Sequence, residues 1–252
     1  MQNVLVHAPF AQRLLAGDVA MTITRWGVIR ACGNKPGLQV EHERNVSRND
    51  EQSRAPRQRA TRLTLLCRGA TMANRQARLS PDDPLLHGEL ERTATLARSL
   101  RPFDTVLHAP ETGALETAKA FSNAPICCEA LADIDYGRWT GETIAVIAEH
   151  SPDDFQRWMA DPAAAPHGGE AFDTAAARAV SWLETLHGAG GNVLAVTHGM
   201  ILKLLLAHVL SAPLTSVWRI DVEPLGMLRL SSDGNRWALR GFGGAVPQPA
   251  DA

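Results

Sequence analysis

The sequence predicts a three-layer α/β fold in which helices flank a mostly parallel central sheet. Two apolar runs, RLTLL (62–66) and NVLAV (192–196), end in small or polar turn residues, a pattern typical of buried parallel strands. Helix-length segments with a hydrophobic face lie between these runs, so strands and helices alternate along the chain. The last part of the sequence carries shorter strand-like segments, which we expect near an edge of the sheet.

The expected elements follow this alternation in order. The strands are predicted over 62–66, over 104–110, where the pattern is weaker, over 192–196, and then over 216–222, 226–232 and 235–241. The helices are predicted over 88–100, 111–121, 169–188 and 200–210. Gly188 closes the third helix, because glycine readily takes the left-handed conformation that ends a helix.

One domain and two flanking segments are predicted. Residues 33–60 contain almost no large apolar side chains, so they cannot offset the entropy cost of ordering. Residues 1–61 are therefore expected to form a flexible N-terminal extension, and residues 1–32 within it can be a docked arm or disordered. A start codon assigned too far upstream would give the same pattern. The domain is expected over 62–243, followed by a flexible tail over 244–252.

Composition excludes several functional classes. The 252 residues are 45% hydrophobic with a net charge of −2, and residues 1–61 hold nine basic against five acidic residues, too mild an excess for a nucleic-acid tail. The absence of a long apolar stretch and of a secretory signal predicts a cytoplasmic protein without membrane partners. Neither the cysteines nor the histidines show metal-ligand spacing, so we expect no metal, no cofactor and no disulfide framework.

Three turns are expected to form the ligand site. Ligands of open α/β sheets bind beyond the carboxyl ends of the strands. The turns CRGAT (67–71), HAPETG (108–113) and THG (197–199) follow three of the predicted strands and should meet in one crevice.

Five motifs in one order give the chain a family resemblance over about 180 residues, from Arg62 to Arg240. They are LLCRGATMAN, APETGALETA, LADIDYGRWTG, PHGGEAF and VTHGMILK. Together they resemble the histidine phosphatase superfamily, in its phosphoglycerate-mutase-like branch, and the resemblance implies that fold. It also implies phosphomonoester hydrolysis without metal, through a histidine that carries the phosphoryl group until water removes it. Two arginines would bind phosphate, a second histidine would assist, and a carboxylic acid would protonate the leaving oxygen.

The resemblance places individual residues in that site. His198 occupies the second-histidine position, and Asp133 stands for the acid, with Asp135 as a competitor for the role. The phosphate pocket would include seven further residues: Cys67, Arg68, Gly69, Thr71, Asn74, Gly113 and Glu170. Three of these depart from the pattern, because Arg68 replaces the nucleophilic histidine, Cys67 the first arginine and Gly113 the second arginine. Lys203 fits a position that lines or braces the site.

These departures lead to two functional hypotheses. The favoured one is a pseudoenzyme that binds a small phosphorylated metabolite or another anion, because a guanidinium stays protonated and cannot attack phosphorus. The alternative is an active metal-independent phosphomonoesterase in which His198 attacks and Arg68 holds the phosphate. Cys67 is a weaker candidate nucleophile, and mutase activity is the weakest option.

Three further expectations concern the contacts of Arg68, the restoration of activity and the oligomeric state. Arg68 can instead form a buried salt bridge with Asp133 or Glu170. Exchange of Arg68 for His together with Gly113 for Arg should restore hydrolysis. A homodimer is compatible with the sequence.

Overall fold

The computed structural model describes residues 60–79 and 82–244. The predicted extension lies outside these ranges except for its last two residues, and of the predicted tail only Gly244 lies inside them. Both flanking segments therefore stay predictions. Within the described residues, no helix is long and apolar enough to cross a membrane.

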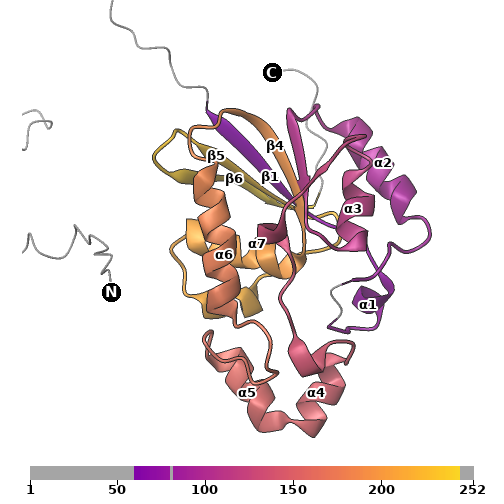
Figure 1. Cartoon of the computed structure of the whole chain (residues 1–252), viewed down its shortest axis with the longest axis vertical. Coiled ribbons are helices and arrows are strands. Elements are labelled where there is room, and N and C mark those ends of the chain that lie inside the picture. The colour runs from indigo at the N-terminus through magenta and orange to yellow at the C-terminus, as the bar shows by residue number, and fades with distance from the viewer. Residues whose placement is uncertain (1–59, 80–81, 245–252) are drawn as a thin grey trace, which may run out of the picture. The chain divides into compact units, whose positions relative to one another are not determined.

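A mostly parallel central sheet organises the domain, as the sequence predicted (Figure 1), and it has six strands, of which β3 was not predicted. Its spatial order is β3-β2-β4-β1-β5-β6, and β1 pairs in parallel with β4, β4 with β2, and β2 with β3. Strands β5 and β6 are antiparallel and form one edge. The strands are β1 Thr61–Cys67, β2 Thr105–His108, β3 Ile126–Cys127, β4 Gly191–Thr197, β5 Met227–Ser232 and β6 Trp237–Gly243.

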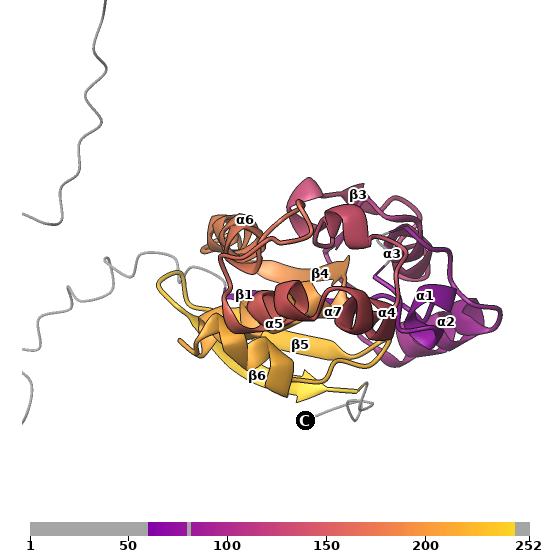
Figure 2. The ribbon, with the colours of Figure 1, turned by 90° about the horizontal axis from the view of Figure 1, so that it is seen from below.

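Helices flank this sheet in two groups. Helix α3 packs against β2 and β4 with α2 beside it, whereas α7 packs against β1 and β6 with α6 beside it. Seen from below, in Figure 2, α4 and α5 lie across the ends of the strands. The helices are α1 Met72–Arg75, α2 Glu89–Ser99, α3 Thr112–Ala118, α4 Ile144–His150, α5 Pro152–Ala160, α6 Phe172–Thr185 and α7 Gly199–Val209. Short 3₁₀ turns are η1 Glu129–Leu131, η2 Gly137–Trp139 and η3 Leu214–Arg219.

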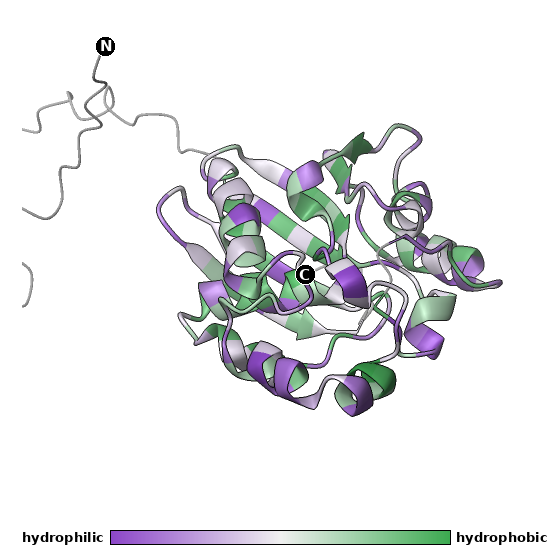
Figure 3. Ribbon diagram, turned by 60° about the horizontal axis from the view of Figure 1, so that its bottom comes forward, coloured by the Kyte–Doolittle hydropathy of each residue, from purple (hydrophilic) through white to green (hydrophobic). Residues whose placement is uncertain are grey.

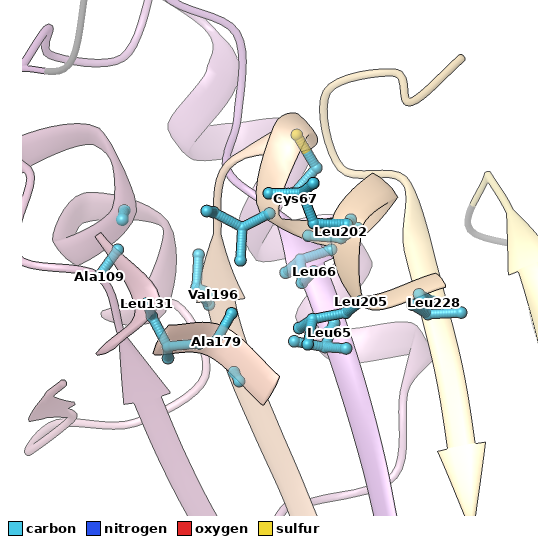
Figure 4. Packing of buried hydrophobic residues seen from close by; sticks show 14 of the residues in the cluster. Leu65, Leu66, Cys67, Ala109, Leu131, Ala179, Val196, Leu202, Leu205 and Leu228 are labelled. Atoms are coloured by element: carbon cyan, nitrogen blue, oxygen red, sulfur yellow. The ribbon is translucent and has the colours of Figure 1, made fainter. Parts of the chain in front are cut away.

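The core lies between β1 and α7. Figure 3 shows stretches of hydrophobic residues along the central strands, whereas the helices carry hydrophobic and hydrophilic residues side by side. Leu65 and Leu66 of β1 and Leu202 and Leu205 of α7 are fully buried, and Figure 4 shows their side chains within one cluster of buried residues. Burying side chains of this size stabilises a fold by about 1.5–3 kcal/mol each. This packing fixes the position of the turns that follow β1 and β4.

One predicted strand is wrong. Residues 216–222 do not pair with the sheet, because Leu214–Arg219 forms the 3₁₀ turn η3. Val217 is buried there, and the indole of Trp218 donates to the carbonyl of Met159 at 2.9 Å and packs edge-on against Trp158. The apolar residues of this segment therefore cover α5 and its neighbours, and their burial produced the strand-like pattern.

Candidate functional site

The turn after β1 is held rigidly by hydrogen bonds. The Arg68 amide donates to the carbonyl of Thr197 at 2.8 Å, and the Gly69 amide donates to the Thr117 hydroxyl at 3.0 Å. Thr71 is fully buried and begins α1, where its amide and its hydroxyl each donate to Asn74 Oδ1 at 3.1 Å. The turn therefore has a fixed shape that aims Arg68 at the turns after β2 and β4.

Arg68 is a buried cation, with 6% of its surface exposed. Its Nη1 donates to Asn74 Oδ1 at 2.8 Å and to the carbonyl of Gly69 at 3.1 Å. Its Nε lies 3.3 Å from Nδ1 of His198. Arg68 and His198 therefore lie side by side, although they are 130 positions apart in the sequence.

His198 sits directly before α7 with a carboxylate on each ring nitrogen. Its Nε2 lies 2.9 Å from Glu111 Oε2, and its Nδ1 lies 3.1 Å from Asp133 Oδ2. Burial opposes a charge on this ring, but the two carboxylates outweigh it and raise the pKa of His198 from 6.5 to about 9. At neutral pH the ring is therefore an imidazolium that donates to both carboxylates.

This protonation state decides between two contacts at Nδ1. If Arg68 Nε donated to Nδ1, that nitrogen would have to be unprotonated and could not donate to Asp133. The Asp133 contact is shorter and joins opposite charges, so we assign the proton to Nδ1. The 3.3 Å approach of Arg68 Nε is then a contact between two cations, both balanced by the surrounding carboxylates.

Asp133 is ionised in this arrangement. Burial alone would raise its pKa, but the charge and hydrogen bond of His198, the Ile134 amide and the charge of Arg68 together lower it below the ordinary 3.8. Its carboxylate binds His198, and the alternative salt bridge from Arg68 to Glu170 is wrong, because Glu170 pairs with Arg178.

Cys67 is a neutral thiol. The side chain is buried under α7, and this burial raises its pKa to about 12, although the charge of Arg68 acts in the opposite direction. A thiol is a far weaker nucleophile than a thiolate.

A pocket of about 220 Å³ opens beside these groups. Six residues that the sequence placed at the site line it: Cys67, Arg68, Asn74, Asp133, His198 and Lys203. The other lining residues are Arg78, Leu79, Tyr136, Gly199, Met200, Val222 and Pro224. The predicted residues Gly69, Thr71, Gly113 and Glu170 do not line it.

Gly113 lies underneath the Arg68 side chain. A Cβ atom added at this glycine would lie 2.8 Å from the carbonyl oxygen of Asp83 and 3.2 Å from Cδ of Arg68. Asp82 holds the same region by accepting from the Thr112 amide at 2.8 Å. The arginine at 68 and the glycine at 113 are therefore sterically linked, and a larger residue at 113 requires the Asp82–Asp83 segment to move.

Glu170 supports the site from outside. It binds Arg178 through two hydrogen bonds, from Nε to Oε1 at 3.1 Å and from Nη2 to Oε2 at 2.8 Å. The same guanidinium donates to the carbonyls of Ala130 at 2.9 Å and Ala132 at 3.1 Å. Arg178 of α6 thus holds the turn that carries Asp133.

The sequence did not single out Glu111 or Arg78. Glu111 lies in the HAPETG turn, and it accepts from the Asp133 amide at 3.0 Å as well as from His198. The one sequence feature that could have identified Glu111 as a site residue is its position directly after a predicted strand. Arg78 donates to the carbonyl of Gly141 at 2.7 Å, and no pattern in the sequence connects these two residues.

The site offers fixed charges rather than metal ligands. Among the residues that the structure describes, no group of three or more His, Cys, Asp or Glu side chains could hold a metal ion. What remains is a small pocket lined by guanidinium, imidazolium and ammonium groups with one carboxylate.

Comparisons with known proteins agree with the fold. The family model described as histidine phosphatase superfamily (branch 1) matches residues 63–243. Bifunctional protein Rv2228c of Mycobacterium tuberculosis is 29% identical over 195 residues, which cover 69% of this chain and 51% of that protein. This chain thus spans about half the length of that relative.

Two further similarities concern proteins described as phosphatases. Adenosylcobalamin/alpha-ribazole phosphatase of Salmonella typhimurium is 28% identical over 173 residues, 64% of this chain and 86% of that protein. The solved structure described as a putative alpha-ribazole-5'-P phosphatase from Escherichia coli has a TM-score of 0.67 at 23% identity, and covers 75% of this chain and 99% of that one. The latter similarity concerns the fold alone.

Proposed function

Because this chain belongs to the histidine phosphatase superfamily (branch 1), we propose that it is a member that binds phosphate-like anions without transferring the phosphoryl group. One observation carries the proposal. His198, the one imidazole that lines the pocket in the described part of the chain, is protonated on both nitrogens between two carboxylates. By the family resemblance, Arg68 stands at the position of the attacking histidine.

None of the three candidate nucleophiles, Arg68, His198 and Cys67, is ready to attack phosphorus. A guanidinium has no free electron pair at any physiological pH. His198 would have to lose a proton from a group whose pKa is raised to about 9, and the lone pair so exposed would face a carboxylate. Cys67 is held as a thiol by burial. Loss of the nucleophile of a catalytic unit lowers turnover by roughly 10⁶-fold.

The charges of the pocket favour an anionic ligand. Arg68, Arg78 and Lys203 line it together with protonated His198, whereas Asp133 is its one acidic lining residue. Asp133 is already neutralised by His198. The pocket volume of about 220 Å³ is below the range of roughly 300–1,000 Å³ typical of drug-sized ligands. These features support a small phosphorylated metabolite as the ligand class.

The alternative is an active metal-independent phosphomonoesterase. The side-by-side placement of Arg68 and His198 favours it, because an arginine could hold a phosphate next to an attacking imidazole. This route requires His198 to be neutral and free of Glu111 and Asp133 during turnover.

Two measurements on the same preparation test the proposal. Calorimetric titration should show binding of inorganic phosphate, weakened at least tenfold in Arg78→Gln and unchanged in Arg98→Gln, an exposed arginine outside the pocket. Hydrolysis of p-nitrophenyl phosphate should be no faster than for His198→Ala. Turnover clearly above that variant would establish the alternative, and a lack of phosphate binding would refute the anion pocket.

A further inference from the structure

Lys203 is an amine placed inside the proposed anion pocket. It lies on the second turn of α7, half-buried, and lines the pocket together with Arg68 and Arg78. Among the residues that the structure describes, the other lysine is Lys119, and it does not line this pocket. Lys119 is exposed at the end of α3.

Burial makes the ammonium group of Lys203 easier to deprotonate than that of an exposed lysine. Burial lowers its pKa below the ordinary 10.5, although the charges of Asp221 and Cys67 act in the opposite direction. Cys67 is a neutral thiol at physiological pH, so Asp221 is the acidic group of these two that supports the charged amine. A partly desolvated lysine next to other cations is the kind of amine that reacts with carbonyl compounds.

We propose that the pocket binds small phosphorylated aldehydes, and that Lys203 forms a reversible imine with them. This inference rests on the anion pocket proposed above and names the ligand class of that pocket. Arg78 and Arg68 would hold the phosphate, and Lys203, which lines the same pocket, would meet the carbonyl carbon.

The covalent step is a condensation without net oxidation or reduction. The nitrogen of neutral Lys203 attacks the aldehyde carbon, and a C–N bond forms. The carbonyl oxygen then leaves as water, taking up the two protons that the nitrogen loses. Addition of water to the imine reverses the step, so the pocket needs no further reactant.

Trapping with borohydride tests the inference in the full-length protein. Hydride reduces the imine carbon and leaves a stable secondary amine, which peptide mass spectrometry locates. With limiting glyceraldehyde 3-phosphate near neutral pH, Lys203 should be labelled at least tenfold more than Lys119 in the same sample. Inorganic phosphate should suppress the label on Lys203, and glyceraldehyde without phosphate should label it at least tenfold less.

Variants separate the amine from the anion site. Lys203→Arg removes the primary amine, so it should lose the preferred label, whereas Lys119→Arg, outside the pocket, should behave as the wild type. Equal labelling of Lys203 and Lys119 in a protein that binds phosphate would overturn the imine and leave the anion pocket standing. Absence of phosphate binding would overturn the proposed function, independently of any labelling.

Discussion

The charge state of His198 is the feature that a single substitution probes best. Glu111→Gln replaces the carboxylate that lies 2.9 Å from Nε2 with a neutral amide of the same shape. The amide oxygen can still accept from the Asp133 amide, which lies 3.0 Å from the carboxylate, so the turn should keep its structure. With its oxygen on the Asp133 amide, the new side chain turns its NH2 group toward Nε2 of His198, so the substitution removes both the negative charge and the hydrogen-bond acceptor at Nε2.

The expected magnitude follows from that contact. A hydrogen bond to a charged group contributes roughly 1.5–3 kcal/mol, and one pKa unit corresponds to about 1.4 kcal/mol. The pKa of His198, about 9 in the wild type, should therefore fall by roughly one to two units in Glu111→Gln. Asp133→Asn should act in the same direction through Nδ1.

Nitrogen-15 NMR of the imidazole groups measures this pKa directly. The signal of His198 is identified by its loss in His198→Ala, and its chemical shift is followed from pH 5 to 10. Glu184→Gln is the matched control, because that carboxylate binds His187 at 2.8 Å and not His198. The reasoning is refuted if wild-type His198 titrates near 6.5, or if Glu111→Gln leaves its pKa unchanged.

Two predictions concern stability. The pKa of His198 is about 9 in the folded protein, above the value of 6.5 in the unfolded chain. Protonation of His198 therefore adds up to about 3 kcal/mol to the free energy of unfolding. This contribution is complete below pH 6.5 and is lost as the pH rises through 9. Urea denaturation at pH 6 and pH 9.5 should show this loss, and it should be much smaller in His198→Ala. Gly113→Ala should destabilise the domain by about 1–3 kcal/mol, because its Cβ would lie 2.8 Å from the Asp83 carbonyl. Helix propensity alone predicts that alanine stabilises the domain at this position. If that is what is measured, the inferred clash of a Cβ atom at residue 113 is refuted.

Much of the fold follows from local patterns in the sequence. The runs at 62–66 and 192–196 became β1 and β4, because continuous apolar residues ending in a turn are typical of strands buried on both faces. The pattern at 216–222 misled, since Val217 and Trp218 are buried by α5 and not by strand pairing. Periodicity reports which side chains are buried, and it does not report which element buries them.

Site residues that belong to the recognised motifs could be predicted from the sequence. Residues that reach the site only through long-range contacts could not. Arg68, Asp133 and His198 meet as expected, because each follows a recognisable strand or turn. Glu111 was missed, since a glutamate after a strand is ordinary until the fold brings it to His198, 87 positions away. Glu170 was placed in the pocket, whereas its partner is Arg178 on the following helix.

The proposed reversion of the site is also more demanding than the sequence indicated. Arg68→His together with Gly113→Arg supplies the two groups that the family resemblance implies, but an arginine at 113 collides with the Asp83 carbonyl unless that segment moves. Restored hydrolysis therefore requires a shift of residues 82–83 as well as the two exchanges.

Detection of a phosphoryl-enzyme tests the central claim most directly. The protein is incubated with acetyl phosphate under conditions that label active histidine phosphatases, quenched at alkaline pH and analysed by intact-mass spectrometry. With an imidazolium locked between Glu111 and Asp133 beside Arg68, the mass should stay that of the unmodified chain. A gain of one phosphoryl group located on His198 would contradict the account.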